Sequence, residues 1–195
     1  MHTLASSNAE AIQQVAAVYI PDDSLVLDCT YGRGRFWAWE HSLNLVSLDI
    51  VGNPAQIRGD FRCLPFRDET FDACIFDPPY YGHGAQTQEQ FGASNQLAWF
   101  LRKTEPIRNL YMKGLLEASR VTKNHGIIVV KCTDGCDYHP MLPWITSLRI
   151  GKFLDSVIRT NPSLRNWTPN TAPRKKLRTC HSYFIVLQNA YFGRT

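Results

Sequence analysis

The chain has 195 residues, of which 44% are hydrophobic and 19% are charged. This length and composition suit one compact domain with a buried core and exclude an intrinsically disordered chain. No apolar run has the length that spans a bilayer, and Met1–Gln13 lacks the basic and apolar regions of a signal peptide. We therefore predict a single domain over residues 1–195 that lies in the cytoplasm and not in a membrane.

Six cysteines are present, and several lie inside apolar runs such as residues 71–76. Buried free thiols are therefore a better interpretation than disulfides. Cys132, Cys136 and His139 lie close together, but their spacing matches no standard zinc pattern, so we predict no metal site.

The first half of the chain begins with helical spacing of apolar residues over 8–19, with Ser7 or Asn8 as the cap. A short strand of the buried type, 25–27, then stops at Asp28. The next predicted elements are a glycine-containing loop at 30–35, a short helix at 36–40, a strand at 45–48 that stops at Asp49, and a short strand within 56–61.

The second half contains a strand at 72–76 that Pro78 and Pro79 stop. The polar, glycine-rich segment that follows is long enough to predict a functional loop. The remaining predicted elements are a helix at 97–121 with a break at Pro106, a stop at 124–126, a strand at 127–131, a helix at 142–157, a strand at 157–159, a polar loop at 161–179 and a last strand at 183–187.

Strands that alternate with helices predict a doubly wound, Rossmann-like α/β sheet with helices on both faces. In such sheets ligands bind at the carboxyl ends of the strands. Four successive predicted strands run into a carboxylate, namely Asp28, Asp49, Asp60 and Asp77. We therefore expect these four side chains at one site.

The loop after the first of these strands carries Gly32 and Gly34, which allow the backbone to approach a ligand closely. Trp37 stands where a dinucleotide fingerprint has a small residue, and no Gly-Lys-Ser/Thr is present. Both facts argue against NAD, FAD and nucleoside triphosphates.

Asp49 lies 21 residues after Asp28, a spacing that suits a carboxylate bound to a ribose diol. A ribose without a pyrophosphate predicts S-adenosylmethionine as the cofactor. Asp60 is then the acceptor for the adenine amino group, with Phe61 as a wall, and a turn-capping role for Asp60 is an equal alternative.

The tetrapeptide Asp77-Pro78-Pro79-Tyr80 is the most specific feature of the chain. Its prolines hold the backbone extended, so the Pro78 carbonyl and the Asp77 carboxylate offer two acceptors close together. These acceptors match the two protons of an exocyclic amine on a nucleic-acid base. Tyr80 provides an aromatic face for a base that is flipped out of its stack.

These motifs resemble those of class I S-adenosylmethionine-dependent methyltransferases, specifically the amino-methyltransferase group that acts on adenine N6 or cytosine N4 of DNA. The first motif of the family resembles residues 26–34, its fifth strand residues 126–131, and its last, antiparallel strand residues 181–186. The resemblance implies catalysis by Asp77, Pro78, Pro79 and Tyr80. It implies cofactor binding by Asp28, Cys29, Thr30, Tyr31, Gly32, Gly34, Asp49, Ile50, Asp60 and Phe61.

The chain departs from this family in size, because only 16 residues separate Asp60 from Asp77 and leave no room for a target-recognition domain. In this it resembles small phage or prophage DNA methylases. Substrate contacts are then expected from residues 81–96 and 161–179, with little sequence recognition or with help from a partner subunit or a second copy. Cys29 stands where the family usually has Gly or Pro.

Basic residues gather near the C-terminus, within a chain of net charge +4. Such a cluster suits a phosphate backbone, and a solvated loop is the alternative. The predicted nucleic-acid contacts are Arg165, Trp167, Arg174, Lys175, Lys176 and Arg178.

Adenine N6 of DNA is the favoured target, and three alternatives stay open. The first is guanine-N2 or adenine-N6 methylation of RNA. The second is a methyltransferase-like subunit that binds nucleic acid without catalysis. The third is a small-molecule or protein-glutamine methyltransferase, whose related tetrapeptide usually begins with Asn instead of Asp77.

Overall fold

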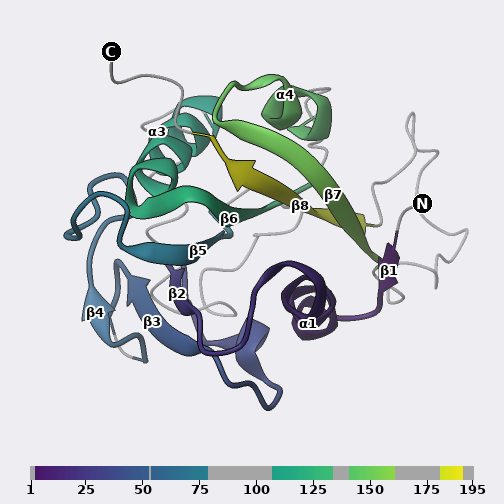
Figure 1. The fold of residues 1–195 in the computed structure, drawn as a ribbon, viewed down its shortest axis with the longest axis horizontal. Helices are drawn as coiled ribbons and strands as arrows, with labels where there is room; N and C mark the ends of the chain where they lie inside the picture. Colours follow the sequence, from purple (N-terminus) through teal and green to yellow (C-terminus); the bar gives the residue numbers. More distant parts are fainter. Residues whose placement is uncertain (1–2, 53, 79–106, 134–140, 161–180, 191–195) are drawn as a thin grey trace, which may run out of the picture.

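The computed structural model describes residues 3–52, 54–78, 107–133, 141–160 and 181–190, which form an eight-stranded sheet with helices on both faces (Figure 1). The strands are β1 (Thr3–Ala5), β2 (Leu25–Asp28), β3 (Asn44–Asp49), β4 (Ile57–Arg58), β5 (Phe71–Phe76), β6 (Thr122–Cys132), β7 (Gly151–Thr160) and β8 (His181–Asn189). The helices are α1 (Asn8–Tyr19), the short 3-10 helix η1 (Arg35–Trp37), α3 (Ile107–Val121) and α4 (Met141–Ser147).

The strand order is β1-β7-β8-β6-β5-β2-β3-β4. Among the described strands, β8 alone runs antiparallel to its neighbours, β6 and β7, and every other pair is parallel. The prediction of a mostly parallel sheet with an antiparallel last strand is confirmed. Because the central strands are parallel, the segments that follow β2, β3, β5 and β6 leave the sheet at one edge, which we call the carboxyl edge.

Each face of the sheet packs its own hydrophobic core. On one face α1 buries Ala11, Ile12, Val15 and Ala16, and the Ser7 side chain caps this helix by accepting a hydrogen bond from the Glu10 N–H, as predicted. The other face packs α3 and α4. Because the central strands are covered on both sides, most of their residues are apolar.

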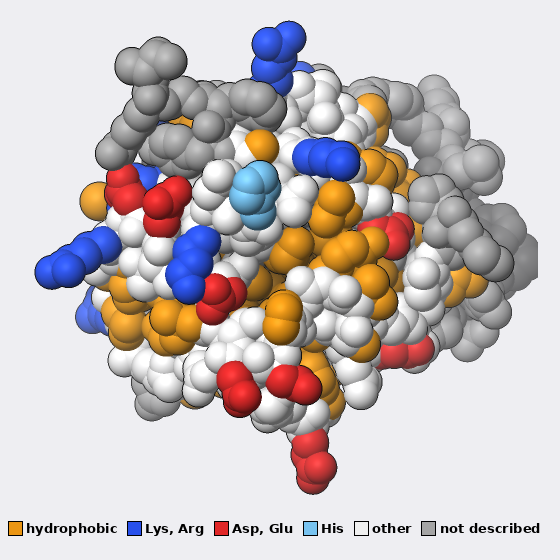
Figure 2. Space-filling view, viewed as in Figure 1, with side chains coloured by type: hydrophobic (Ala, Val, Ile, Leu, Met, Phe, Trp, Pro, Cys, Tyr) orange, Lys and Arg blue, Asp and Glu red, His pale blue; other side chains and the backbone are white. Residues whose placement is uncertain are grey.

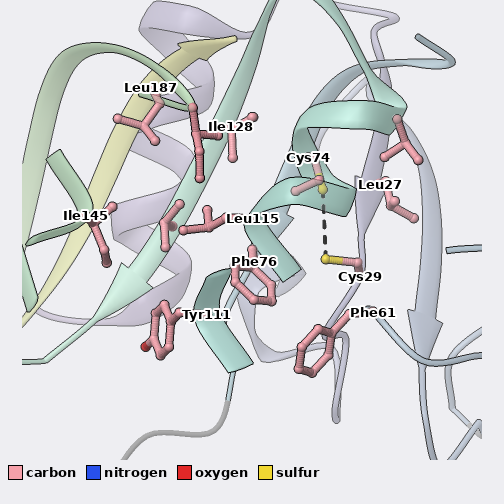
Figure 3. Close-up of a cluster of buried hydrophobic side chains, with 14 of the residues drawn as sticks. Leu27, Cys29, Phe61, Cys74, Phe76, Tyr111, Leu115, Ile128, Ile145 and Leu187 are labelled. Atoms are coloured by element: carbon pink, nitrogen blue, oxygen red, sulfur yellow. Dashed lines mark hydrogen bonds between the residues drawn. The ribbon is translucent and has the colours of Figure 1, made fainter. Parts of the chain in front are cut away.

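The core beneath α3 surrounds Phe76, the last residue of β5 (Figure 3). A β-carbon at Gly114 would lie 2.2 Å from Cζ of Phe76, so this glycine lets the helix approach the strand. In the same core Cys29 and Cys74 are buried free thiols with their sulfurs 3.8 Å apart, as Figure 3 shows, whereas Cys63 is an exposed free thiol. The prediction of buried free thiols holds for these two cysteines.

The predicted helix over 142–157 is wrong beyond its first turns, because α4 ends at Ser147 and β7 begins at Gly151. The apolar residues along β7 are compatible with helical spacing as well as with a half-buried strand. Pairing with β8 along the whole of β7 decides the outcome. A β-carbon at Gly151 would lie 2.5 Å from the Gln188 carbonyl oxygen. The glycine therefore allows the first residue of β7 to approach β8 closely.

Three smaller expectations are corrected. The predicted stop at 124–126 lies inside β6, where His125 has φ 63° and the register against β5 shifts. The predicted helix at 36–40 is the single turn of η1. The edge strand β1 was not predicted, since three residues are too few for a periodic signal.

Several predicted segments lie outside the described residues: 81–96, the first part of the helix at 97–121, and the loop at 161–179. No helix among the residues that the structure describes is long and apolar enough to cross a membrane.

We expect Gly114→Ala to lower the free energy of unfolding by about 1–3 kcal/mol, measured by urea denaturation. Alanine in a helix interior normally gains about 1 kcal/mol over glycine, but here the new methyl group overlaps the Phe76 ring. Asn109→Ala, at an exposed position of the same helix, is the control and should be neutral or stabilising. Equal behaviour of the two variants would contradict this packing.

Candidate functional site

The loop after β2 and the residues after β5 meet at the carboxyl edge. The backbone N–H of Asp77 donates a hydrogen bond of 2.7 Å to the Thr30 hydroxyl oxygen, and the backbone N–H of Cys29 donates to the Ile75 carbonyl at 3.2 Å. The structure therefore brings the predicted cofactor loop and the predicted catalytic motif into direct contact.

The two glycines of this loop have left-handed backbones, with φ 56° at Gly32 and φ 68° at Gly34. A β-carbon at Gly34 would lie 2.5 Å from the Tyr31 hydroxyl, so the Tyr31 side chain closes over that glycine. At Gly32 the nearest atom to such a carbon is the Thr30 carbonyl oxygen at 4.0 Å. Among the described residues, the position beside Gly32 is therefore open.

Asp28 is buried beneath this loop and accepts two hydrogen bonds. Its carboxylate oxygens accept from the Thr30 backbone N–H at 3.1 Å and from the Trp37 indole N–H at 2.7 Å. Burial raises the pKa of Asp28 to about 7, and the nearby carboxylates of Asp77 and Asp49 add to this effect against the two hydrogen bonds. The contact with Trp37 was not predicted, because no local pattern in the sequence connects an indole with a carboxylate nine residues before it.

Asp49 connects the end of β3 to the glycine loop. Its two carboxylate oxygens accept hydrogen bonds of 2.9 Å from the backbone N–H groups of Gly32 and Val51. Each oxygen keeps a second lone pair, so the carboxylate can still accept from a ribose hydroxyl. Ile50 follows in the turn, where its carbonyl accepts from the Arg58 side chain at 3.2 Å.

Asp60 does not end a strand as predicted, because β4 ends two residues earlier, at Arg58. The Asp60 carboxylate accepts from the backbone and side chain of Arg62, with the shortest contact at 2.6 Å. Partial burial opposes this pairing, yet the bonds to Arg62 hold the pKa of Asp60 below its usual value. The bond from the Arg62 backbone N–H is a turn-capping contact, which is the alternative role that the sequence left open for Asp60.

Phe61 points into the core and not toward open space. Its ring is in edge contact with Phe76, with centroids 5.2 Å apart (Figure 3), and the residue is only 7% exposed. Little of this ring remains available as the wall that was predicted for adenine.

Asp77 directly follows β5, and its carboxylate forms an ion pair that the sequence analysis did not predict. One oxygen, Oδ2, accepts from the Lys131 ammonium at 2.9 Å. The other, Oδ1, is buried and has no hydrogen-bond partner in the described structure. Pro78 is buried beside it, whereas Pro79 and Tyr80 lie outside the described residues.

The side chains of Lys131, Ser182 and Arg159 lie on the same face of the sheet as α1, because each residue lies two positions along its strand from a residue that packs in that core. Arg159 and Ser182 are register partners at the ends of β7 and β8 that reach the carboxyl edge. Among the described residues, the Ser182 hydroxyl and the Arg159 Nε are buried and have no hydrogen-bond partner. No sequence motif distinguished these donors, because the antiparallel pairing of β8 places them there.

The predicted nucleic-acid contacts, Arg165, Trp167, Arg174, Lys175, Lys176 and Arg178, lie outside the described residues. On the face of the molecule in Figure 2, the described surface mixes hydrophobic, acidic and basic side chains. Among the described residues no group of three or more His, Cys, Asp and Glu side chains is arranged to hold a metal ion, and Cys136 and His139 lie outside them.

Comparison of the fold with solved structures finds methyltransferases. The Burkholderia thailandensis 1,6-didemethyltoxoflavin-N1-methyltransferase, solved with S-adenosylhomocysteine, matches with a TM-score of 0.61 and 14% identity over 94% of this chain and 79% of that chain. A chain from the complex of the Haloferax volcanii Trm112 activator with a putative methyltransferase matches with a TM-score of 0.57 and 12% identity over 95% and 90%. TrmN from Thermus thermophilus matches with a TM-score of 0.55 and 13% identity over 93% of this chain and 48% of TrmN.

No protein-family model matches the chain, and a search of curated proteins finds no match. The structural similarities, at these low identities, show the fold alone. That fold is the Rossmann-like fold of the class I S-adenosylmethionine-dependent methyltransferases, as the sequence predicted.

We expect Asp28→Asn to change the pH dependence of stability. The folded-state pKa of Asp28, about 7, lies above the ordinary value of 3.8, so the folded protein holds this proton more tightly than the unfolded chain. The free energy of unfolding should therefore fall as the pH rises from about 4 to about 7, then level off. In the variant this component is absent, so urea denaturation at pH 5 and pH 8 should show a smaller fall.

Glu40→Gln, at an exposed position of the same segment, is the control and should keep the wild-type slope. An identical slope in Asp28→Asn and the wild type would show that Asp28 does not titrate in this range.

Proposed function

We propose that this chain is an S-adenosylmethionine-dependent methyltransferase that methylates the exocyclic amine of a nucleic-acid base, with adenine N6 of DNA as the favoured target. The observation that carries the proposal is the Asp77 carboxylate in its Asp-Pro-Pro-Tyr context. It lies against the glycine loop of a methyltransferase fold, and one of its oxygens is buried with no hydrogen-bond partner among the described residues.

The residues around the glycine loop fit S-adenosylmethionine, and the Burkholderia neighbour was solved with the demethylated cofactor. Asp49 would hold the ribose, and the space at Gly32 would admit the ligand beside Thr30. The buried carboxylate of Asp28 favours a positively charged ligand near the loop. When bound, this cofactor supplies a sulfonium methyl group, whose S–C bond breaks, with its electron pair left on sulfur, as the new N–C bond forms.

The chain's own residues would prepare the amine for this transfer. Asp77 Oδ1 accepts one amine proton and the Pro78 carbonyl accepts the other, which localises the nitrogen lone pair and holds it in line with the methyl group. The methylated nitrogen carries a positive charge until one proton leaves through Asp77 Oδ1 to water, and the carboxylate stabilises that charge.

Two observations support a polar, anionic substrate. The basic segment of residues 165–178 follows β7 in the chain, and the Arg159 and Ser182 donors at the carboxyl edge have no hydrogen-bond partner among the described residues. RNA is the second nucleic-acid candidate, with guanine N2 or adenine N6 as the target. A small molecule is a third candidate, because the Burkholderia neighbour is by its name a methyltransferase that acts on 1,6-didemethyltoxoflavin.

We expect Asp77→Ala to abolish methyl transfer, by about a thousandfold or more, while cofactor affinity stays within a few fold. The assay incubates labelled cofactor with duplex DNA, single-stranded DNA, RNA and free heteroaromatic amines, then identifies the methylated nucleoside by mass spectrometry. Asp72→Ala is the matched control, because it removes the carboxylate that pairs with Lys123 at the opposite end of β5. Equal loss of cofactor binding and turnover in Asp77→Ala would place the site elsewhere.

Asp49→Ala should instead weaken cofactor binding, by about ten- to a hundredfold, since it removes a charged acceptor and the bond that holds Gly32. Calorimetry measures the dissociation constant, and the rate at saturating cofactor should stay near that of the wild type. Unchanged cofactor affinity would remove Asp49 from the cofactor site.

A further inference from the structure

The ammonium of Lys131 occupies a buried position between strand ends. Phe76 and Val130 are register partners in β5 and β6, so Asp77 and Lys131 follow side by side on the face that α1 covers. The Lys131 side chain is 5% exposed and the Asp77 side chain 19%. A buried lysine at a strand end is costly unless it is paired, and its 2.9 Å contact with Asp77 provides that pair.

Aromatic rings and backbone bonds restrain this lysine on several sides. Its Nζ lies 5.4 Å from the ring centroid of Phe36 in η1 and 5.8 Å from that of Phe184 in β8. Both contacts are attractive for a cation over an aromatic face. The Lys131 carbonyl accepts a hydrogen bond of 3.1 Å from the buried Tyr111 hydroxyl. The ammonium therefore contacts Asp77 and two aromatic rings.

The consequence for Asp77 is that its two oxygens differ. Oδ2 is bound to Lys131, and Oδ1 is buried with no partner in the described structure. The Asp77 backbone N–H is bound to the Thr30 hydroxyl, so Thr30 and Lys131 hold the main chain and the carboxylate from two sides. One oxygen is left in a fixed direction to accept a proton from a substrate.

Resting on the proposed function, we propose that Lys131 is a positioning residue that orients Asp77 and restricts the site to uncharged, conjugated amines. The ion pair has no net charge, so a neutral amine on an aromatic ring approaches Oδ1 without repulsion. An aliphatic amine is protonated at neutral pH, so it has no lone pair for methyl transfer, and the Lys131 ammonium opposes the approach of its charge to Asp77. Buried ion pairs contribute little net stability, so orientation and charge selection are what this pair adds.

The test compares three variants by single-turnover methyl transfer at saturating cofactor, with calorimetry for cofactor affinity and thermal unfolding for integrity. Lys131→Met should slow transfer about a hundredfold and leave cofactor affinity within twofold, because the carboxylate loses its fixed orientation. Lys131→Gln keeps an N–H donor for Oδ2 and should retain about tenfold more activity than Lys131→Met.

Lys123→Met is the matched control, because Lys123 pairs with Asp72 at 2.7 Å on the same two strands at their opposite ends, in an exposed position. It should keep the wild-type rate. Combining Lys131→Met with Asp77→Asn should be no slower than Asp77→Asn alone, since both changes act through one carboxylate. A merely structural role for Lys131 would make the two effects add.

The substrate restriction is tested with oligonucleotides that contain either adenine or a 5-aminomethyl pyrimidine, whose aliphatic amine is protonated. The wild type should methylate only the adenine, and comparable methylation of the aminomethyl group would overturn the restriction. Full activity of Lys131→Met would overturn the positioning role. Equal activity of Lys131→Gln and Lys131→Met would overturn it too. A wild-type protein that methylates no base in DNA or RNA would refute the proposed function instead, and that assay is run first.

Discussion

The parallel pairing of β2 with β3 on one side and with β5 on the other is the constraint on which the site depends. In this register Asp28 lies between Ser47 and Ile75, so three loops leave the sheet next to one another. Backbone bonds continue the pairing past the strands, since the Tyr31 N–H donates to the Leu48 carbonyl at 3.1 Å. A slip of one residue would turn Asp28 and its neighbours to the opposite face and dismantle the site.

The edge formed in this way concentrates ionisable groups that are costly to bury. Asp28, Asp49 and Lys131 are each less than 10% exposed, and each has a defined partner. Backbone N–H groups and an indole N–H serve the first two, and Asp77 serves the lysine. The raised pKa of Asp28 indicates that these bonds only partly offset the loss of hydration. Such an arrangement persists because the hydrophobic cores on both faces of the sheet hold the strands in place.

One short turn supplies two of these partners. Between β2 and β3 the chain forms only η1, whose Trp37 donates to Asp28 and whose Phe36 faces the Lys131 ammonium. The cofactor side and the catalytic side of the proposed site therefore share a support of three residues. A change in η1 is expected to affect both cofactor binding and methyl transfer, whereas a change at Asp49 or Asp77 is expected to affect mainly one of them.

The sequence by itself determined the fold class, the apolar strands, and the order in which Asp28, Asp49 and Asp77 reach the carboxyl edge. These follow from local pattern, because strand residues buried on two faces are continuously apolar and turn residues mark where the strands end. The tertiary structure alone decided the long β7 and the ion pair of Lys131 with Asp77. These depend on which strands lie side by side, and contacts between residues far apart in the chain leave no periodic signal in either segment.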